Sequence, residues 1–98
     1  MEIKQEKLVA NERFYIEEDN NTLAEMVYHF IDKTIFVITH TEVDESLEGK
    51  GIGRKLVVAA VDYARKNSLI IKATCPFAKK VLDRTPEFAD VYNAEKNN

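Results

Sequence analysis

The chain has 98 residues, of which 45% are hydrophobic and 32% charged, a balance typical of one globular domain with no room for a second core. Fourteen Lys and Arg against seventeen Asp and Glu give a net charge of −3, which disfavours nucleic-acid binding. No stretch approaches the ~20 apolar residues of a membrane span, and the amino terminus lacks the apolar segment of a signal peptide. The single cysteine, Cys75, cannot form a disulfide within the chain. We therefore expect a cytoplasmic protein that binds neither nucleic acid nor membrane.

The first half of the sequence predicts strands joined by short turns. Strands are expected at residues 1–9, 13–18, 23–31 and 34–43, of which the last is rich in β-branched residues. Turn-forming residues separate these stretches. Four strands with such short connections predict an antiparallel meander.

The hydrophobic period changes after residue 49. Ile52, Leu56, Ala60 and Ala64 recur every four residues, which predicts an amphipathic helix that ends near Asn67 and packs on the sheet.

The remaining third of the chain predicts one more strand and short helices. A buried strand is expected at 69–73, and a helix is expected to begin at Pro76 and end before Pro86. Three residues would form the apolar face of this helix: Phe77, Val81 and Leu82. A last turn is expected over 88–92.

The order of these elements predicts the fold class. A strand, a long helix and a strand form a βαβ unit, whose two strands are parallel. We therefore expect an α/β fold, more narrowly α+β, with an antiparallel meander followed by a βαβ unit and short C-terminal helices. Residues 1–92 would form a single domain, and residues 93–98 a flexible tail. Ligands of such sheets bind beyond the carboxyl ends of the strands, where the crossover helix begins.

The only three glycines of the chain fall within five positions at that edge: Gly49, Gly51 and Gly53. Glycine allows positive φ and a close backbone approach, and a helix N-terminus attracts phosphate groups. Basic residues add local positive charge to an acidic chain: Lys50, Arg54 and Lys55. The pattern favours phosphate binding over the alternative, a tight turn with solvated lysines. It matches neither a nucleotide P-loop nor a full dinucleotide fingerprint.

Residues 43–56, VDESLEGKGIGRKL, closely resemble motif A of the GCN5-related N-acetyltransferases, which reads Arg/Gln-x-x-Gly-x-Gly/Ala after a strand. Glu48 stands where that family has Arg or Gln. The resemblance implies a minimal fold of that family, with splayed parallel strands and a backbone cradle for the pyrophosphate of acetyl-CoA. It implies the following cofactor-binding residues: Thr41, Val43, Lys50, Gly51, Ile52, Gly53 and Arg54. The chain also resembles a short subfamily that shares a His-Thr pair, here His40-Thr41, and a Cys-Pro-Phe segment, here residues 75–77.

Two residues at the predicted edge are candidates for catalysis. Histidine as a residue type can exchange a proton near neutral pH, so His40 is a candidate general base, although a histidine satisfied on a sheet face is an equal alternative. Cys75 precedes a helix whose dipole favours a thiolate, so it can accept an acetyl group with His40 as its base. The alternative for Cys75 is a small buried hydrophobe. Two histidines and one cysteine show no metal-ligand spacing, so no metal site is expected.

Three functions remain open from the sequence. The first is transfer of acetyl from acetyl-CoA to an amine of a protein, peptide or small molecule. The second is a non-catalytic sensor or adaptor that binds acetyl-CoA, and the third is an interaction protein whose glycine loop is structural. The chain is short for the family it resembles, which implies an open site for a large acceptor, a homodimer that completes the site, or no acceptor.

Overall fold

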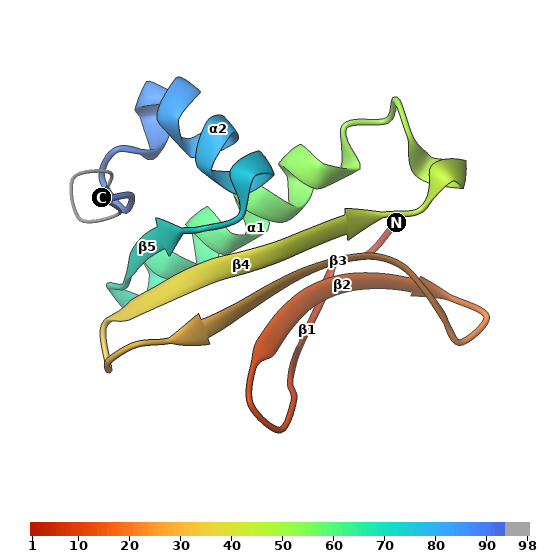
Figure 1. The fold of residues 1–98 in the computed structure, drawn as a ribbon, viewed down its shortest axis with the longest axis horizontal. Helices are drawn as coiled ribbons and strands as arrows, with labels where there is room; N and C mark the ends of the chain where they lie inside the picture. Colours follow the sequence, from red (N-terminus) through yellow and green to blue (C-terminus); the bar gives the residue numbers. More distant parts are fainter. Residues whose placement is uncertain (94–98) are drawn as a thin grey trace.

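The structure, a computed structural model, describes residues 1–93. Its sheet has five strands in the order of the chain, and neighbouring strands pair in antiparallel fashion except the last two, which are parallel (Figure 1). The strands are β1 (Lys4–Lys7), β2 (Glu12–Glu18), β3 (Asn21–Phe30), β4 (Ile35–Val43) and β5 (Ile70–Ala73). The predicted meander and βαβ unit are both confirmed, because short turns can join only antiparallel neighbours.

The crossover between β4 and β5 is the helix α1 (Ile52–Asn67), which runs along one face of the sheet (Figure 1). A short 3-10 helix, η1 (Glu45–Leu47), precedes it. After β5 the chain forms α2 (Pro76–Arg84), which packs against α1 and against β4 and β5, and the 3-10 helix η2 (Pro86–Phe88). Within the described residues no helix combines the length and apolarity needed to span a membrane.

The face of the sheet that contacts α1, here called the inner face, holds the core. Alternate strand residues project onto it, as the period of two requires, and the apolar stripe of α1 covers them. The largest fully buried side chains are Tyr28, Phe36, Met26, Ile38, Leu56, Ile71, Val57 and Val61. The Tyr28 ring lies 4.9 Å from the Phe36 ring, and burial raises the pKa of the Tyr28 hydroxyl far above its usual value. That hydroxyl accepts from Gln5 Nε2 at 2.6 Å and donates to Glu12 at 3.2 Å, so no unpaired polar atom is buried there.

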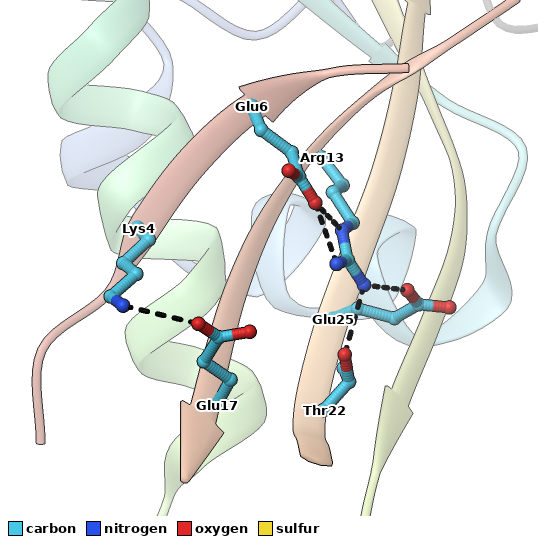
Figure 2. Close-up of polar contacts among 6 residues, drawn as sticks. All are labelled: Lys4, Glu6, Arg13, Glu17, Thr22 and Glu25. Carbon is cyan, nitrogen blue, oxygen red and sulfur yellow. Dashed lines mark hydrogen bonds and ion pairs between the residues drawn. The ribbon is translucent and has the colours of Figure 1, made fainter. Parts of the chain in front are cut away.

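The opposite face, here called the open face, is polar, and Figure 2 shows the ion pairs on it. The Arg13 guanidinium on β2 lies between Glu6 of β1, at 2.6 Å, and Glu25 of β3, at 2.8 Å. Lys4 pairs with Glu17 at 3.3 Å. These cross-strand contacts allow four antiparallel strands to keep one face in water.

Several boundaries differ from the sequence-based expectations. The strand expected at 1–9 covers only Lys4–Lys7, because the Leu8 N–H donates to the Asn11 carbonyl in a turn that leaves Val9 fully exposed. The turn expected at 88–92 is confirmed, since the Tyr92 N–H donates to the Phe88 carbonyl at 3.1 Å; it follows the 3-10 helix η2 and leads into an isolated bridge from Tyr92 to Ile71.

The predicted tail begins at residue 93, where the Asn93 N–H still donates to the Ile71 carbonyl at 3.2 Å. Residues 94–98 lie outside the described residues.

The apolar face predicted for α2 is wrong at one position. Leu82 is buried as expected, and its partner one turn earlier is Ala78. Phe77 is instead 42% exposed, because it lies on the side of the helix that faces the N-terminus of α1.

Candidate cofactor-binding groove

The site is created where β4 and β5 part. Their parallel pairing ends at Ile38 and Ala73, and the N–H groups of Thr74 and Cys75 both donate to the Ile38 carbonyl, at 3.0 and 3.1 Å. The chain then turns away into α2, whereas β4 continues to Val43, held by β3 alone. From residue 39 onward, no strand among residues 1–93 pairs with the side of β4 that faces away from β3.

A bulge at Thr39 accompanies this separation. Val27 pairs with His40 and Tyr28 with Ile38, which leaves Thr39 as the extra residue of β4. The Thr39 hydroxyl donates to the Val27 carbonyl at 3.4 Å. One extra residue reverses the alternation of side chains, so after the bulge the odd-numbered positions project onto the inner face. Thr41 and Val43 therefore line the groove described below.

The segment after β4 is held by a local cap. Asp44 accepts from the Ser46 hydroxyl at 2.6 Å and from its N–H at 3.0 Å, which starts η1 and holds the pKa of Asp44 below its ordinary value. Leu47 then anchors the turn in the core. The loop that follows is thus fixed at both ends, by this turn and by α1.

Two of the three glycines have the conformation that sequence analysis expected of a backbone cradle. Gly49 has φ +79° and Gly51 has φ +69°, values that other residues adopt at a cost of about 1–2 kcal/mol. A Cβ atom at either position would meet nothing within 4 Å. The space beside both residues is therefore open, and their positive φ rather than a close neighbouring group favours glycine there.

The N-terminus of α1 opens onto that space without a cap. Gly51 is the N-cap residue, so no side chain satisfies the first N–H groups of the helix. The first turn holds no acidic residue but carries Arg54 and Lys55, which the helix dipole disfavours at this end. An anion bound here would satisfy the free N–H groups and offset this unfavourable placement of charge.

The groove that contains the cradle has a volume of about 440 Å³ and runs from β4 to α2. It is lined by Thr41, Val43, Leu47, Glu48, Gly49, Gly51, Ile52, Gly53, Arg54, Phe77 and Val81. All of the predicted cofactor-binding residues are among them except Lys50, which is exposed and lies outside the lining.

Gly53 has a different role from the other two glycines. It lies inside α1 with ordinary helical backbone, and a Cβ there would approach the Phe77 ring to 2.6 Å. The missing side chain lets α2 come close to α1, and so brings Phe77 into the groove wall.

The Arg54 side chain turns away from the cradle. Its Nη1 donates to Thr85 Oγ1 at 3.3 Å, and its guanidinium lies 5.7 Å from the centre of the Phe88 ring. Only the backbone of Arg54 therefore belongs to the uncapped helix end, and its charge is directed toward the end of α2.

The two predicted catalytic residues lie on different faces of the sheet. Cys75 is 5% exposed, and its Sγ donates to Thr41 Oγ1 at 3.4 Å on the inner face. His40 precedes Thr41 in β4, so it projects onto the open face, where its Nε2 lies 3.3 Å from Glu42 Oε2. The structure does not bring His40 and Cys75 together. Cys75 is also absent from the groove lining and sits behind Thr41.

His40 belongs to a small cluster on the open face. Ligand-type atoms of Glu25, His40 and Glu42 lie within 4.8 Å of one another, an arrangement that the sequence spacing did not predict. Glu25 is already ion-paired with Arg13, and Glu42 Oε2 lies within hydrogen-bond distance of His40 Nε2, so these groups form a polar network on the open face.

Sequence reasoning missed two groove residues, Phe77 and Val81, as parts of a site because it assigned both to the core. The periodic pair Ala78 and Leu82 is the signal that could have placed them elsewhere. If that pair is the buried stripe of α2, then residues 77 and 81 lie beside it, facing α1.

Comparisons with known proteins agree with this architecture. The profile of the family described as GCN5-related N-acetyl-transferase matches residues 13–91. A GCN5-like candidate N-acetyltransferase from Staphylococcus aureus is 44% identical, with a TM-score of 0.77 over 95% of this chain and 88% of that one. The ribosomal-protein-alanine N-acetyltransferase of Brucella melitensis, at 20% identity and a TM-score of 0.59, shares the fold over 87% of this chain and 65% of its own. This chain belongs to the GCN5-related N-acetyltransferase family.

The curated relatives that match are longer proteins. Protein NATD1 of Bos taurus is 32% identical over 63 residues, which is 64% of this chain and 56% of that protein, and the Homo sapiens protein matches to the same extent. The matched region thus spans little more than half of these relatives.

Proposed function

We propose that this protein binds acetyl-CoA in the groove and transfers the acetyl group to a primary amine. The observation that carries the proposal is the continuity of the groove, which joins the unpaired edge of β4 to the uncapped N-terminus of α1. A narrow arm can lie along the strand edge while an anion occupies the cradle. Acetyl-CoA has both parts. Its narrow pantetheine arm carries the acetyl group at one end and is joined to the pyrophosphate at the other.

The residues of the cradle fit the cofactor through backbone groups. Gly49 and Gly51 leave the space that a pyrophosphate needs, and the first N–H groups of α1 point at it. Thr41 and Val43 line the part of the groove beside β4. Glu48, which replaces the Arg or Gln of the motif, also lines the groove, so the backbone and not the Glu48 side chain would hold the phosphates.

The reaction needs few protein groups. Bound acetyl-CoA would supply a thioester, whose carbon–sulfur bond breaks as the carbon–nitrogen bond forms, so that coenzyme A leaves as a thiolate and then takes a proton from solvent. The unpaired edge of β4 can donate a backbone N–H to the thioester oxygen. His40 would take the proton from the amine, working from the open face through the gap where β4 and β5 diverge.

The open face beside His40 suits a cationic acceptor. A hollow of about 250 Å³ there is lined by Arg13, Thr22, Leu23, Ala24, Glu25, Glu42 and Asp44. Arg13 is neutralised by its own partners, which leaves Glu42 and Asp44 to attract an ammonium group. No helix of the described residues covers this face, so a protein or peptide can reach it.

A second candidate function is a module that binds acetyl-CoA without catalysis. This alternative is favoured because His40 does not line the groove. Among the described residues that do line it, Glu48 is the one carboxylate. In that case Cys75 is a packing residue, as its burial behind Thr41 suggests. We also propose a cytoplasmic setting, since the lone cysteine is free, and leave a homodimer as one way to complete the acceptor site.

Titration calorimetry with acetyl-CoA tests the proposal first. We expect saturable binding to the wild type and none to Gly51→Val, whose side chain fills the cradle. Ser68→Val is the matched control, because Ser68 has φ +57° at the other end of α1 and far from the groove. Each variant places a β-branched residue at positive φ, but Ser68 already has a Cβ and so gains less strain; thermal unfolding shows whether both variants fold, and only the first should lose binding. Absence of binding to the wild type, or equal losses in both variants, would overturn the proposal.

Acetyl transfer is measured separately, as release of the coenzyme A thiol in the presence of a peptide and amine pool. Release that depends on the acceptor supports transfer. Tight binding with no release from any acceptor supports the non-catalytic module. Mass spectrometry of the protein after incubation with acetyl-CoA tests the covalent alternative: an acetyl adduct on Cys75 would support it, and an unmodified Cys75 would exclude it.

A further inference from the structure

A second groove continues from the first along α2. It has a volume of about 420 Å³ and is lined by Arg54, Phe77, Lys80, Val81, Arg84, Thr85 and Glu87. Arg54, Phe77 and Val81 line both grooves, so the two form one surface. A ligand that enters the cradle can therefore extend past Phe77 toward the end of α2.

The second groove is basic although the chain as a whole is acidic. Three cations, Arg54, Lys80 and Arg84, line it with one acid, Glu87. Arg54 is fixed there by Thr85, whose hydroxyl in turn donates to the Val81 carbonyl at 2.7 Å. A guanidinium held by a hydroxyl and an aromatic ring keeps its remaining donors free for a ligand.

Helix α2 contains two pairs of residues four positions apart that make a natural comparison. Lys79 and Asp83 form an ion pair at 3.1 Å. Lys80 and Arg84, one residue further along, carry like charges, which destabilises a helix. Neither forms an ion pair with any of the described residues, whereas Arg65 on α1 pairs with Asp90. The helix thus keeps two cations side by side, facing the groove, and Glu87, the one acid among the residues that line it, forms no ion pair with either.

We infer that Arg54, Lys80 and Arg84 bind the 3′-phosphate of coenzyme A, an inference that rests on the proposed function. Coenzyme A carries a third phosphate group on its adenosine, separated from the pyrophosphate by one ribose. The basic groove is continuous with the groove of the cradle, so a phosphate one ribose away from the pyrophosphate can lie in it. The exposed Phe77 ring lies between the two and offers an apolar surface for the adenine. The protein therefore distinguishes coenzyme A from its 3′-dephospho form.

Titration calorimetry with coenzyme A and with 3′-dephospho-coenzyme A tests the inference. We expect the wild type to bind coenzyme A about tenfold more tightly, because a phosphate held by two or three cations forms strong charge-assisted hydrogen bonds. In Lys80→Ala/Arg84→Ala this preference should disappear, with the affinity for the dephospho form unchanged.

The control is Arg65→Ala/Lys79→Ala, which removes the same two charges from residues outside the groove. It should retain the preference, and thermal unfolding confirms that both double variants are folded. Equal binding of the two ligands by the wild type overturns the inference and leaves the proposed function intact. The same holds if Lys80→Ala/Arg84→Ala still binds coenzyme A more tightly than the dephospho form. Binding of neither ligand overturns both.

Discussion

The two faces of the sheet are built from the same strands but differ in what stabilises them. The inner face is closed by α1 and buries aromatic and aliphatic side chains around Tyr28 and Phe36. The open face is wet and is held by cross-strand ion pairs centred on Arg13 (Figure 2). Burial of apolar area dominates folding, and partly exposed ion pairs contribute far less. We therefore expect stability to reside on the inner face, while the open face is free to evolve for an acceptor.

Strand β4 connects the two regions. Its first half is buried between β3 and β5, and its second half, after the bulge at Thr39, has Thr41 toward the groove and His40 toward the open face. Under the proposed function, adjacent residues of this one strand would therefore contact the cofactor from one side and the acceptor from the other.

The largest effect is expected from the inner face. Ile38→Ala removes a fully buried side chain at the end of the β4–β5 pairing and should lower the free energy of unfolding by about 2–5 kcal/mol. Urea unfolding measures the change. Ile31→Ala is the control, because Ile31 is 49% exposed and should shift stability by less than about 0.5 kcal/mol. Similar losses in the two variants would contradict the assignment of the core.

The next effect concerns chemistry on the open face. His40→Gln should lower the turnover number about a hundredfold, because glutamine cannot accept the amine proton, and should leave the affinity for acetyl-CoA unchanged. His40 is 53% exposed, so stability should hardly change. Kinetics and calorimetry together make the measurement, with His29→Gln as the matched control, because His29 is the other histidine of the chain and lines neither the groove nor the hollow at Glu42. An unchanged turnover number would assign His40 a structural role and favour the non-catalytic module.

A smaller loss is expected from the ion pairs of the open face. Arg13→Met removes contacts to Glu6 and Glu25 from a guanidinium that is 16% exposed, and should cost about 1–2 kcal/mol. Because salt screens such pairs, the difference from wild type should shrink when urea unfolding is repeated at high ionic strength. A loss of stability as large as that of Ile38→Ala, or one that does not change with salt concentration, would contradict the contrast between the two faces.

The smallest effect is expected at Asp44, which directly follows β4 and caps η1. Its folded pKa is below its ordinary value of 3.8 because the Ser46 hydroxyl and N–H donate to it. This contribution is present above the ordinary pKa and is lost as pH falls through the lower, folded value. Asp44→Asn keeps a capping oxygen but has no charge, so it should be slightly less stable than wild type above pH 3.8, and the two proteins should converge as the pH falls through the folded pKa of Asp44. The measurement is the melting temperature of both proteins as a function of pH. If the two melting temperatures change with pH in parallel, the Asp44 cap makes no pH-dependent contribution to stability.

Much of the fold could be predicted because it depends on local patterns. The four-residue period from Ile52 to Ala64 identifies α1, and the short turns of the first half allow only a meander. Errors arose where packing overrides propensity. Val9 is β-branched yet lies in an exposed turn, and Phe77 is aromatic yet lines a groove, since Gly53 leaves room for its ring against α1.

The candidate site divides in the same way. Sequence alone determined the glycine cluster, the uncapped start of the helix and the family resemblance, because each depends on residues close together in the chain. Only the tertiary structure decided which glycines face open space, that the Arg54 charge is directed to α2, and that His40 and Cys75 occupy opposite faces. The physical reason lies in two features of β4. The extra residue at Thr39 sets the face onto which every later side chain of β4 projects, and the separation of β4 from β5 opens the groove beside them.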